Sequence, residues 1–212
     1  MIHLDIFSDP VCPWCYLGKA NLDRAIAENG AAPFVIVWHP FQLNPDLPRE
    51  GVDKTAYLTA RLGGPERLSQ IHTHFRDMAL QAGVAMDPDK PKRIPNTLDA
   101  HRLIHWAGVE GRQDQMVQAL FHAYWVDGLD IGAPAVLAKL AGDAGMDAAA
   151  IARLLASDAD RDVVAAREAH ARERGVNAVP TFVIADQYVL SGAQPPELWG
   201  QVIAEVSQAA TA

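Results

Sequence analysis

Residues 2–15 have the sequence IHLDIFSDPVCPWC and contain the only two cysteines of the chain, Cys12 and Cys15. The run at residues 2–7 alternates between apolar and polar side chains, as a half-buried β-strand does. A short turn follows, and Pro13 suits the first position of a helix, where a missing backbone N–H costs nothing. Two cysteines this close on the first turn of a helix can close a disulfide and open it again. The stretch therefore predicts a strand, a turn and a redox-active cysteine pair.

The place of the two cysteines on the helix predicts different roles for them. The start of a helix has unpaired N–H groups and the positive end of the helix dipole, and both favour a negative charge. Because only the thiolate attacks a disulfide, we expect Cys12 to be the exposed nucleophile. Cys15, one turn further on and more buried, is expected to resolve the mixed disulfide.

A structural zinc site and a purely structural disulfide are the alternatives to this hypothesis. A structural zinc site needs two further ligands. His101 and His105 have the spacing of ligands on one helix but lack the glutamate of an HEXXH motif. A purely structural disulfide across so short a loop would constrain the unfolded chain little. We therefore predict no metal site, and no cofactor besides the redox-active disulfide itself.

The composition is that of an ordinary globular protein. With 212 residues, half of them hydrophobic, the chain fits one domain or one domain with a large insertion. Its net charge of -8 argues against a nucleic-acid partner, which usually needs a basic face. No apolar stretch approaches the roughly 20 residues of a membrane span, and the first residues lack the regions of a secretory signal. We expect a cytoplasmic protein without a membrane partner, either a monomer or a homodimer.

The order of the expected elements predicts an α/β protein. Strands at 2–7 and 34–38 flank a helix from about Pro13, which makes a βαβ unit with parallel strands. Residues 53–156 show helical periodicity and no strand. A helix at 158–174, strands at 181–185 and 188–190 and a final helix after Pro196 form an αββα unit. Together these units are typical of a thioredoxin fold. We predict a thioredoxin-like domain of residues 1–50 and 157–212, with an all-helical insertion domain at 51–156.

A second part of the site is predicted at Val179-Pro180-Thr181, just before the third strand of this fold. Proline removes a donor from the strand ladder, so it belongs at the start or edge of a strand. From its place in the strand order we expect Pro180 to be a cis-proline that faces the dithiol. The backbone groups of the residue before it would then pair with an extended substrate segment. A plain trans-proline that starts the strand is the alternative.

Several motifs along the chain form a recognisable set. They are DPVCPWCYLG at 9–18, FQLNP at 41–45, NT at 96–97 with AHR at 100–102, VNAVPTF at 176–182 and SGAQP at 191–195. With these motifs the chain resembles the DsbA-like thioredoxin superfamily over essentially its whole length, and most closely the FrnE-type branch of dithiol oxidoreductases. Ala178 departs from the pattern, because the family often has glycine there.

The resemblance implies a thiol–disulfide oxidoreductase that acts on protein or small-molecule disulfides. Cys12 would attack and Cys15 would resolve, while Pro13 and Trp14 tune the reduction potential. Trp14 is also expected to form part of an apolar rim around Cys12. The resemblance leaves the direction of electron flow open, because reductases, oxidases and isomerases share this chemistry.

Three further residues are weaker candidates for substrate binding. His101 belongs to one of the motifs and is predicted to line the site. His39 follows the second strand, near the strand ends where open α/β sheets tend to bind ligands. Asn44 lies in the next loop, where it would bond a substrate backbone or a glutathione. For all three, a packing or loop-forming role is the alternative.

Two other functions remain open for the same architecture. Glutathione-dependent enzymes of the kappa transferase and 2-hydroxychromene-2-carboxylate isomerase types share it, but they typically have serine where Cys12 stands, because glutathione brings their thiol. A non-catalytic binding module or chaperone would use the cleft beside Pro180. The presence of both cysteines favours the dithiol enzyme, with glutathione as a candidate co-substrate.

Overall fold

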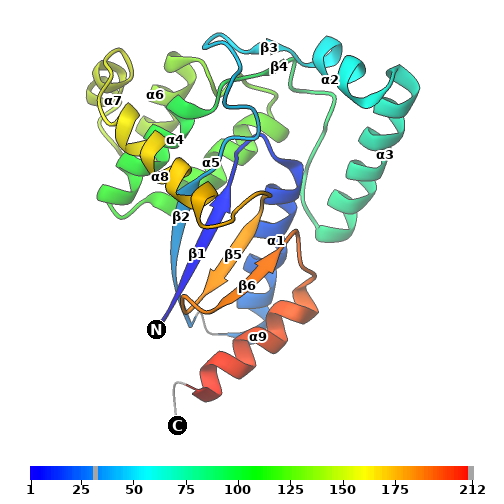
Figure 1. Ribbon diagram of the computed structural model, residues 1–212, viewed down its shortest axis with the longest axis vertical. Helices are drawn as coiled ribbons and strands as arrows, with labels where there is room; N and C mark the ends of the chain where they lie inside the picture. Colours follow the sequence, from blue (N-terminus) through cyan, green and yellow to red (C-terminus); the bar gives the residue numbers. More distant parts are fainter. Residues whose placement is uncertain (31–32, 210–212) are drawn as a thin grey trace.

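A four-stranded sheet lies at the centre of the computed structural model, which describes residues 1–30 and 33–209 (Figure 1). Strands β1 (Ile2–Ser8), β2 (Phe34–Pro40), β5 (Thr181–Ile184) and β6 (Tyr188–Ser191) lie in the order β2-β1-β5-β6. β1 runs parallel to β2 and antiparallel to β5, and β5 and β6 form a hairpin. Residues 31–32 and 210–212 of the predicted thioredoxin-like part lie outside the described residues.

The alternation predicted for the first strand is present in β1. Leu4 and Ile6 are fully buried, whereas His3 is exposed and Asp5 is half-buried. Successive side chains of a strand point to opposite faces, so Leu4 and Ile6 face the core together. This burial sets the register of β1 against its neighbours, because a slip of one residue would turn both side chains away from the core.

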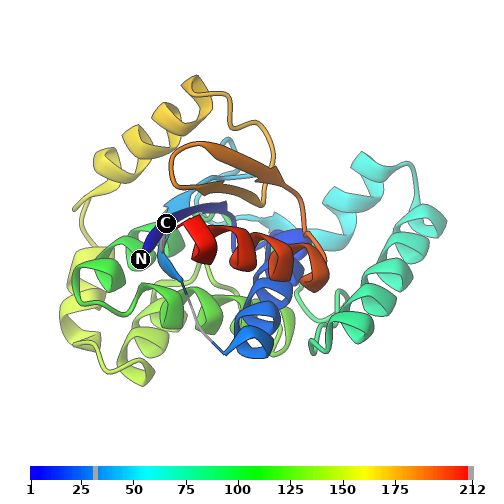
Figure 2. The same cartoon turned by 90° about the horizontal axis from the view of Figure 1, so that it is seen from below.

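Helices cover both faces of the sheet. α1 (Pro13–Asn29) and α9 (Pro196–Ala209) lie on one face, and α8 (Arg161–Glu173) lies on the other (Figure 2). On the first face the ring of Trp199 in α9 packs edge-on against Phe182, with 4.8 Å between the ring centroids. The order β1-α1-β2 followed by α8-β5-β6-α9 confirms the two units predicted from the sequence.

The segment between these units is mainly helical and lies at the end of the sheet where β1 and β2 finish (Figure 1). Its helices are α2 (Lys54–Leu62), α3 (Pro65–Ala82), α4 (Leu98–Val109), α5 (Gln113–Trp125), α6 (Pro134–Asp143) and α7 (Ala148–Leu155). α2 and α3 stand to one side, and α4 to α7 stand to the other. Within the described residues, no helix is long and apolar enough to cross a membrane.

The prediction that residues 53–156 contain no strand is wrong at one point. β3 (Val52–Asp53) pairs antiparallel with β4 (Arg93–Ile94), with Val52 opposite Ile94. Strands of two residues are too short to show an alternating pattern. Their pairing also depends on contacts between segments that are far apart in the sequence, so local periodicity does not indicate it.

One hydrophobic core joins the sheet to the helices of the insertion. It includes Leu4 and Ile6 of β1 together with Leu103 of α4, Phe121 of α5 and Leu137 of α6. Of these helices, α5 packs against β2, while α4 and α6 pack against α5. Trp125 at the end of α5 donates to the carbonyl oxygen of Pro10, which places this end of α5 beside the turn before Cys12.

Candidate active site

The two cysteines lie at the start of α1, as the sequence predicts. Cys12 is the N-cap residue with extended backbone angles (φ -87°, ψ 116°), and Pro13 occupies the first helical position. The backbone N–H of Cys15 donates to the carbonyl oxygen of Cys12 at 3.2 Å. Both thiols are free. The strand-turn-helix layout thus brings two reduced sulfurs onto one helical turn.

Cys12 is buried, so the prediction that it is exposed is wrong. The exposed fraction of Cys12 is 2 % and that of Cys15 is 1 %. The segment before β5 covers the first cysteine, and the Cys12 thiol donates to the carbonyl oxygen of Val179 across 3.7 Å. This cover comes from a segment more than 160 residues away in the chain, so the local sequence around Cys12 does not reveal it.

The segment 179–181 approaches the dithiol because α1 has a glycine at the point of contact. The peptide bond between Val179 and Pro180 is cis. A Cβ atom on Gly18 would lie 3.1 Å from Cγ of Pro180, closer than most such contacts, so glycine permits this packing. The Thr181 hydroxyl donates to the carbonyl oxygen of Ala178 at 2.8 Å and holds the turn. The structure therefore brings Val179 and Pro180 together with the cysteine pair.

The environment of Cys15 keeps its sulfur protonated. Burial raises the pKa of Cys15 well above its ordinary value, and the neighbouring Cys12 thiol raises it further. A buried thiol without a nearby cation has little to stabilise its charged form. Burial thus disfavours the thiolate form of Cys15.

Asp9 is a buried carboxyl group beneath this turn that the sequence analysis did not single out. Its Oδ1 accepts the N–H of Val11 at 3.3 Å, and its Oδ2 accepts the N–H of Leu43 at 2.7 Å. Burial raises the pKa of Asp9 to about 7, although both N–H groups act to lower it. The sequence feature that could have indicated Asp9 is a charged residue inside the DPVC motif, directly before a buried turn.

His101 lies behind Asp9 and not in an open site. Its exposed fraction is 3 %, and its Nε2 lies 3.9 Å from Oδ1 of Asp9 and has no hydrogen-bond partner among the described residues. Burial lowers the pKa of His101 to about 4, so its ring is neutral at physiological pH. The structure thus brings His101 close to the turn before Cys12, where its ring faces the carboxyl group of Asp9.

A cavity of about 410 Å³ opens beside the cysteine turn, between α1, α2, α3 and the end of α5. Val11 and Pro13, the two neighbours of Cys12 in the chain, form part of its wall. Asn44 also lines it, and its Oδ1 accepts a hydrogen bond from the Tyr57 hydroxyl at 2.9 Å. Asn44 therefore lies where a ligand next to the dithiol would reach it.

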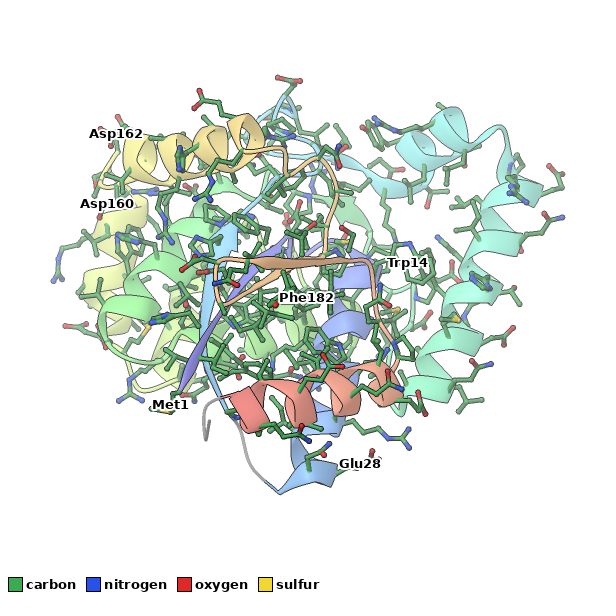
Figure 3. All side chains as sticks on the ribbon, turned by 60° about the horizontal axis from the view of Figure 1, so that its bottom comes forward. Met1, Trp14, Glu28, Asp160, Asp162 and Phe182 are labelled. Atoms are coloured by element: carbon green, nitrogen blue, oxygen red, sulfur yellow. The ribbon has the colours of Figure 1, made fainter. Side chains whose placement is uncertain are left out.

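Trp14 is the most exposed member of the CPWC motif, with 37 % of its surface accessible. Its ring packs edge-on against Phe75 of α3, with 5.0 Å between centroids, and Figure 3 shows it on the side of α1 that faces α3. The aromatic contact joins the motif to the insertion and places an apolar surface beside Cys12.

His39 is held on the other side of the sheet. Its Nε2 lies 2.6 Å from Oδ1 of Asp5, its Nδ1 lies 3.3 Å from Nη2 of Arg167, and its ring stacks on Phe7. None of these contacts within the described chain joins His39 to the cysteine turn or to the cavity wall. Substrate binding by His39 thus stays a prediction that its packing does not support.

The histidines considered as metal ligands have other contacts. His105 Nδ1 lies 3.3 Å from Nη1 of Arg167, whereas His101 faces Asp9. Over residues 1–30 and 33–209, no group of three or more His, Cys, Asp or Glu side chains is arranged to hold a metal ion.

Comparison with known proteins places this geometry in a family. Residues 3–204 match the DsbA-like thioredoxin domain. The uncharacterized protein YwbO of Bacillus subtilis is 28% identical over 205 residues, which cover 96% of each chain. The structure of the probable DsbA oxidoreductase SCO1869 from Streptomyces coelicolor is 31% identical with a TM-score of 0.87, covering 97% of this chain and 89% of that one.

Two more distant structures share the fold. The cytosolic disulfide reductase DsbM from Pseudomonas aeruginosa, solved with glutathione, is 18% identical with a TM-score of 0.67, covering 97% and 99% of the two chains. A 2-hydroxychromene-2-carboxylate isomerase is 17% identical with a TM-score of 0.72, covering 99% and 98%. The family match over nearly the whole chain, together with the strand-turn-helix placement of Cys12 and Cys15, shows that this protein belongs to the DsbA-like thioredoxin domain family.

Proposed function

We propose that this protein is a thiol–disulfide oxidoreductase in which Cys12 is the attacking thiolate and Cys15 the resolving thiol. The observation that carries the proposal is the pair of free sulfurs on the first turn of α1, facing the carbonyl group of Val179. The family is one whose members are generally enzymes of this kind, which supports the proposal without identifying a substrate.

The reaction exchanges two electrons between the protein and a substrate disulfide. The Cys12 thiolate attacks one sulfur, a Cys12–substrate disulfide forms, and the other substrate sulfur leaves as a thiolate that takes up a proton. Cys15 then loses its proton and attacks Cys12, which releases the second substrate thiol. The protein ends with a Cys12–Cys15 disulfide and the substrate with two thiols, and the reverse sequence oxidises a dithiol.

The two cysteine environments support this division of roles. Cys12 is the N-cap of a 17-residue helix, where free backbone N–H groups and the helix dipole favour a negative sulfur. The raised pKa of Cys15 keeps the second sulfur protonated, mainly because it is buried, and the smaller contribution of Cys12 to this shift disappears once Cys12 is part of the mixed disulfide. In addition, the carbonyl of Val179 next to Cys12 is a backbone acceptor that an extended substrate would use.

Substitution of each cysteine separately tests the mechanism. We expect Cys12→Ser to abolish reduction of glutathione disulfide or insulin. We expect Cys15→Ser to stop turnover but to accumulate a stable Cys12–glutathione disulfide, which intact-mass measurement detects. Full activity in Cys12→Ser would disprove the dithiol mechanism. Glutathione transfer or isomerisation that persists in Cys15→Ser would favour the glutathione-dependent alternative, in which the reactive sulfur belongs to glutathione.

The reduction potential of the Cys12–Cys15 pair decides the direction of the reaction. Equilibration in graded glutathione buffers, followed by trapping of free thiols, measures it. A value of about -270 mV, as in thioredoxin, would indicate a reductase, and a value of about -120 mV, as in DsbA, would indicate an oxidant. Failure of any intramolecular disulfide to form would exclude the dithiol mechanism.

A further inference from the structure

The cavity beside the cysteine turn has a charge pattern that disulfide exchange does not require. Lys54 and Arg61 lie in its wall, and among the described residues no aspartate or glutamate does. The chain as a whole has 26 acidic residues against 18 lysines and arginines. A wall with basic but no acidic side chains therefore departs from the overall composition and indicates a site for negative charge.

Lys54 is a buried cation that forms no ion pair with a carboxylate of the described residues. Its exposed fraction is 5 %, its ammonium group donates to the carbonyl oxygen of Pro88, and its Nζ lies 5.5 Å from the ring centroid of Trp125. These contacts orient the ammonium group but bring no negative charge to it. Burial lowers the pKa of Lys54 to about 8, with Asp87 opposing the shift, so the group is still mostly protonated at neutral pH. Burying such a charge is costly unless an anion compensates it.

Arg61 extends the positive region toward the exposed end of the same helix. Lys54 and Arg61 are seven residues apart in α2 and therefore lie on one face of it. Nη1 of Arg61 lies 2.7 Å from the Tyr57 hydroxyl, which in turn donates to Asn44. No ion pair involving Arg61 is present in the described part of the chain. Among the described residues, neither cation of the wall thus has a carboxylate within ion-pair distance that would compete with a bound anion.

Apart from Asn44, His72 and two tyrosines, the rest of the wall is apolar, and it connects to the redox site. It includes Leu58, Leu68, Ile71, Phe75, Ile94 and Trp125. The indole N–H of Trp125 donates to the carbonyl oxygen of Pro10 at 3.1 Å, which ties this wall to the turn before Cys12. A volume of about 410 Å³ lies within the range of small-molecule sites, in which a few polar groups orient an apolar ligand.

We propose that this cavity binds a small organic anion with an apolar body, such as an aromatic carboxylate, whose negative group pairs with the ammonium group of Lys54. Arg61 adds positive charge at the exposed end, and the apolar body packs between α2, α3 and Trp125. Because Val11 and Pro13 flank Cys12, a disulfide of such an acid places its sulfur beside the nucleophile. This last step rests on the proposed function and assigns small apolar acids as the substrate class.

Binding of two matched probes to the reduced full-length chain tests the site without any redox step. We expect naphthalene-2-carboxylate to bind at least about tenfold more tightly than 2-naphthalenemethanol in titration calorimetry, the difference that one ion pair supplies. Lys54→Met, which keeps the apolar stem, should bring the affinity for the carboxylate down to that for the alcohol. Lys90→Met is the control, because Lys90 also donates to a backbone carbonyl, that of Val126, but lies outside the wall.

Equal binding of the two probes to the wild type, or an unchanged preference in Lys54→Met, would overturn the proposal. A merely structural Lys54 predicts a different result, in which Lys54→Met lowers the melting temperature and weakens both probes alike. If Lys54→Met does not fold, the variants Arg61→Gln and Leu58→Trp test the site in its place. The first should weaken carboxylate binding, and the second should fill the cavity and block both probes. Carboxylate binding that survives Leu58→Trp would place the ligand elsewhere.

Reaction with two aromatic disulfides tests the assigned substrate class. In 5,5′-dithiobis(2-nitrobenzoate), the Cys12 thiolate displaces one 5-thio-2-nitrobenzoate and Cys15 displaces the second, which leaves the Cys12–Cys15 disulfide. We expect Lys54→Met to slow this reaction about tenfold more than that of the uncharged 2,2′-dithiodipyridine. If neither reagent oxidises the wild-type pair, the proposed function fails. If both do and Lys54→Met slows them equally, the substrate class is wrong while the proposed function stands.

Discussion

At the scale of single residues, Asp9 connects the cysteine turn to the loop after β2. Its two oxygens accept the N–H groups of Val11 and Leu43, and the N–H of Cys12 donates to its backbone carbonyl at 2.9 Å. The carboxyl group is fully buried, Nε2 of the neutral His101 lies 3.9 Å from its Oδ1, and the negative charge of Glu168 adds to the rise in its pKa. Asp9 therefore holds the backbone on the N-terminal side of Cys12, and no lysine or arginine among the described residues forms an ion pair with its carboxyl group.

We predict that Asp9 makes the stability of the fold depend on pH. The pKa of Asp9 rises from its ordinary value of 3.8 to about 7 in the fold, so its contribution to stability is fully present below about pH 4 and is lost as pH rises through about 7. In Asp9→Asn this dependence is absent. The free energy of unfolding of the wild type should therefore fall relative to that of Asp9→Asn, by up to about 1.4 kcal/mol per pH unit, and level off above pH 8.

Urea unfolding at pH 5, 6, 7 and 8 measures this difference. Asp46→Asn, on an exposed loop, is the control and should follow the wild type. A difference between wild type and Asp9→Asn that stays constant over this range would show that Asp9 is ionised in the fold throughout.

At the scale of elements, the two parts of the insertion differ in how firmly they pack. Three of the 18 residues of α3 are buried, namely Leu68, His72 and Ala79, and in α2 only Lys54 is. By contrast, eight of the 12 residues of α4 are buried. Figure 2 shows α2 and α3 projecting from one side of the molecule. The helices that form one wall of the cavity are therefore the less anchored ones.

We predict that α2 and α3 open locally far more often than α4 and α5. Few buried contacts mean a low free energy of local opening, and amide protons exchange through such openings. Hydrogen exchange followed by mass spectrometry should show peptides from 54–82 exchanging well before peptides from 98–125. Saturating naphthalene-2-carboxylate should slow exchange in the first group. Equal protection of both groups in the free protein would contradict this expectation.

At the scale of the whole molecule, Arg102 links the insertion to the return of the chain toward the sheet. Its guanidinium is fully buried and donates to the carbonyl oxygens of Ala159, Leu154 and Ser157 at 2.7 to 2.9 Å. It also pairs with Asp99 at 2.8 Å. These bonds fasten α4 to the end of α7 and to the segment that leads into α8, which covers the sheet.

We predict that Arg102→Met destabilises the protein by about 3–5 kcal/mol, because it leaves three carbonyl groups without their donor, whereas Asp99 keeps its ion pairs with Arg161 and Arg49. The unfolding midpoint in urea measures the loss. Arg24→Met removes an exposed ion pair with Glu28 instead and should leave the midpoint unchanged. A similar small effect for both variants would mean that water molecules donate hydrogen bonds to the carbonyl groups that Arg102 bonds in the wild type.

The chemistry of the site and the order of the elements follow from local sequence. The alternation at 2–7, the proline after Cys12 and the spacing of the cysteines each act within one strand or one helical turn, so they are visible without a fold. The same holds for the order of the strands and for the position of Pro180 just before β5. These features determine that two sulfurs share the start of a helix.

The state of the site depends on contacts between distant segments, and only the tertiary structure decides it. Cys12 is buried because Val179 lies over it, and Asp9 faces His101 across 92 positions of sequence. Lys54 becomes a buried cation only when α2 packs near Trp125. Burial and pKa are properties of what surrounds a side chain. A single sequence therefore locates the cysteine pair, whereas folding decides how accessible the two sulfurs are and what charge their neighbours carry.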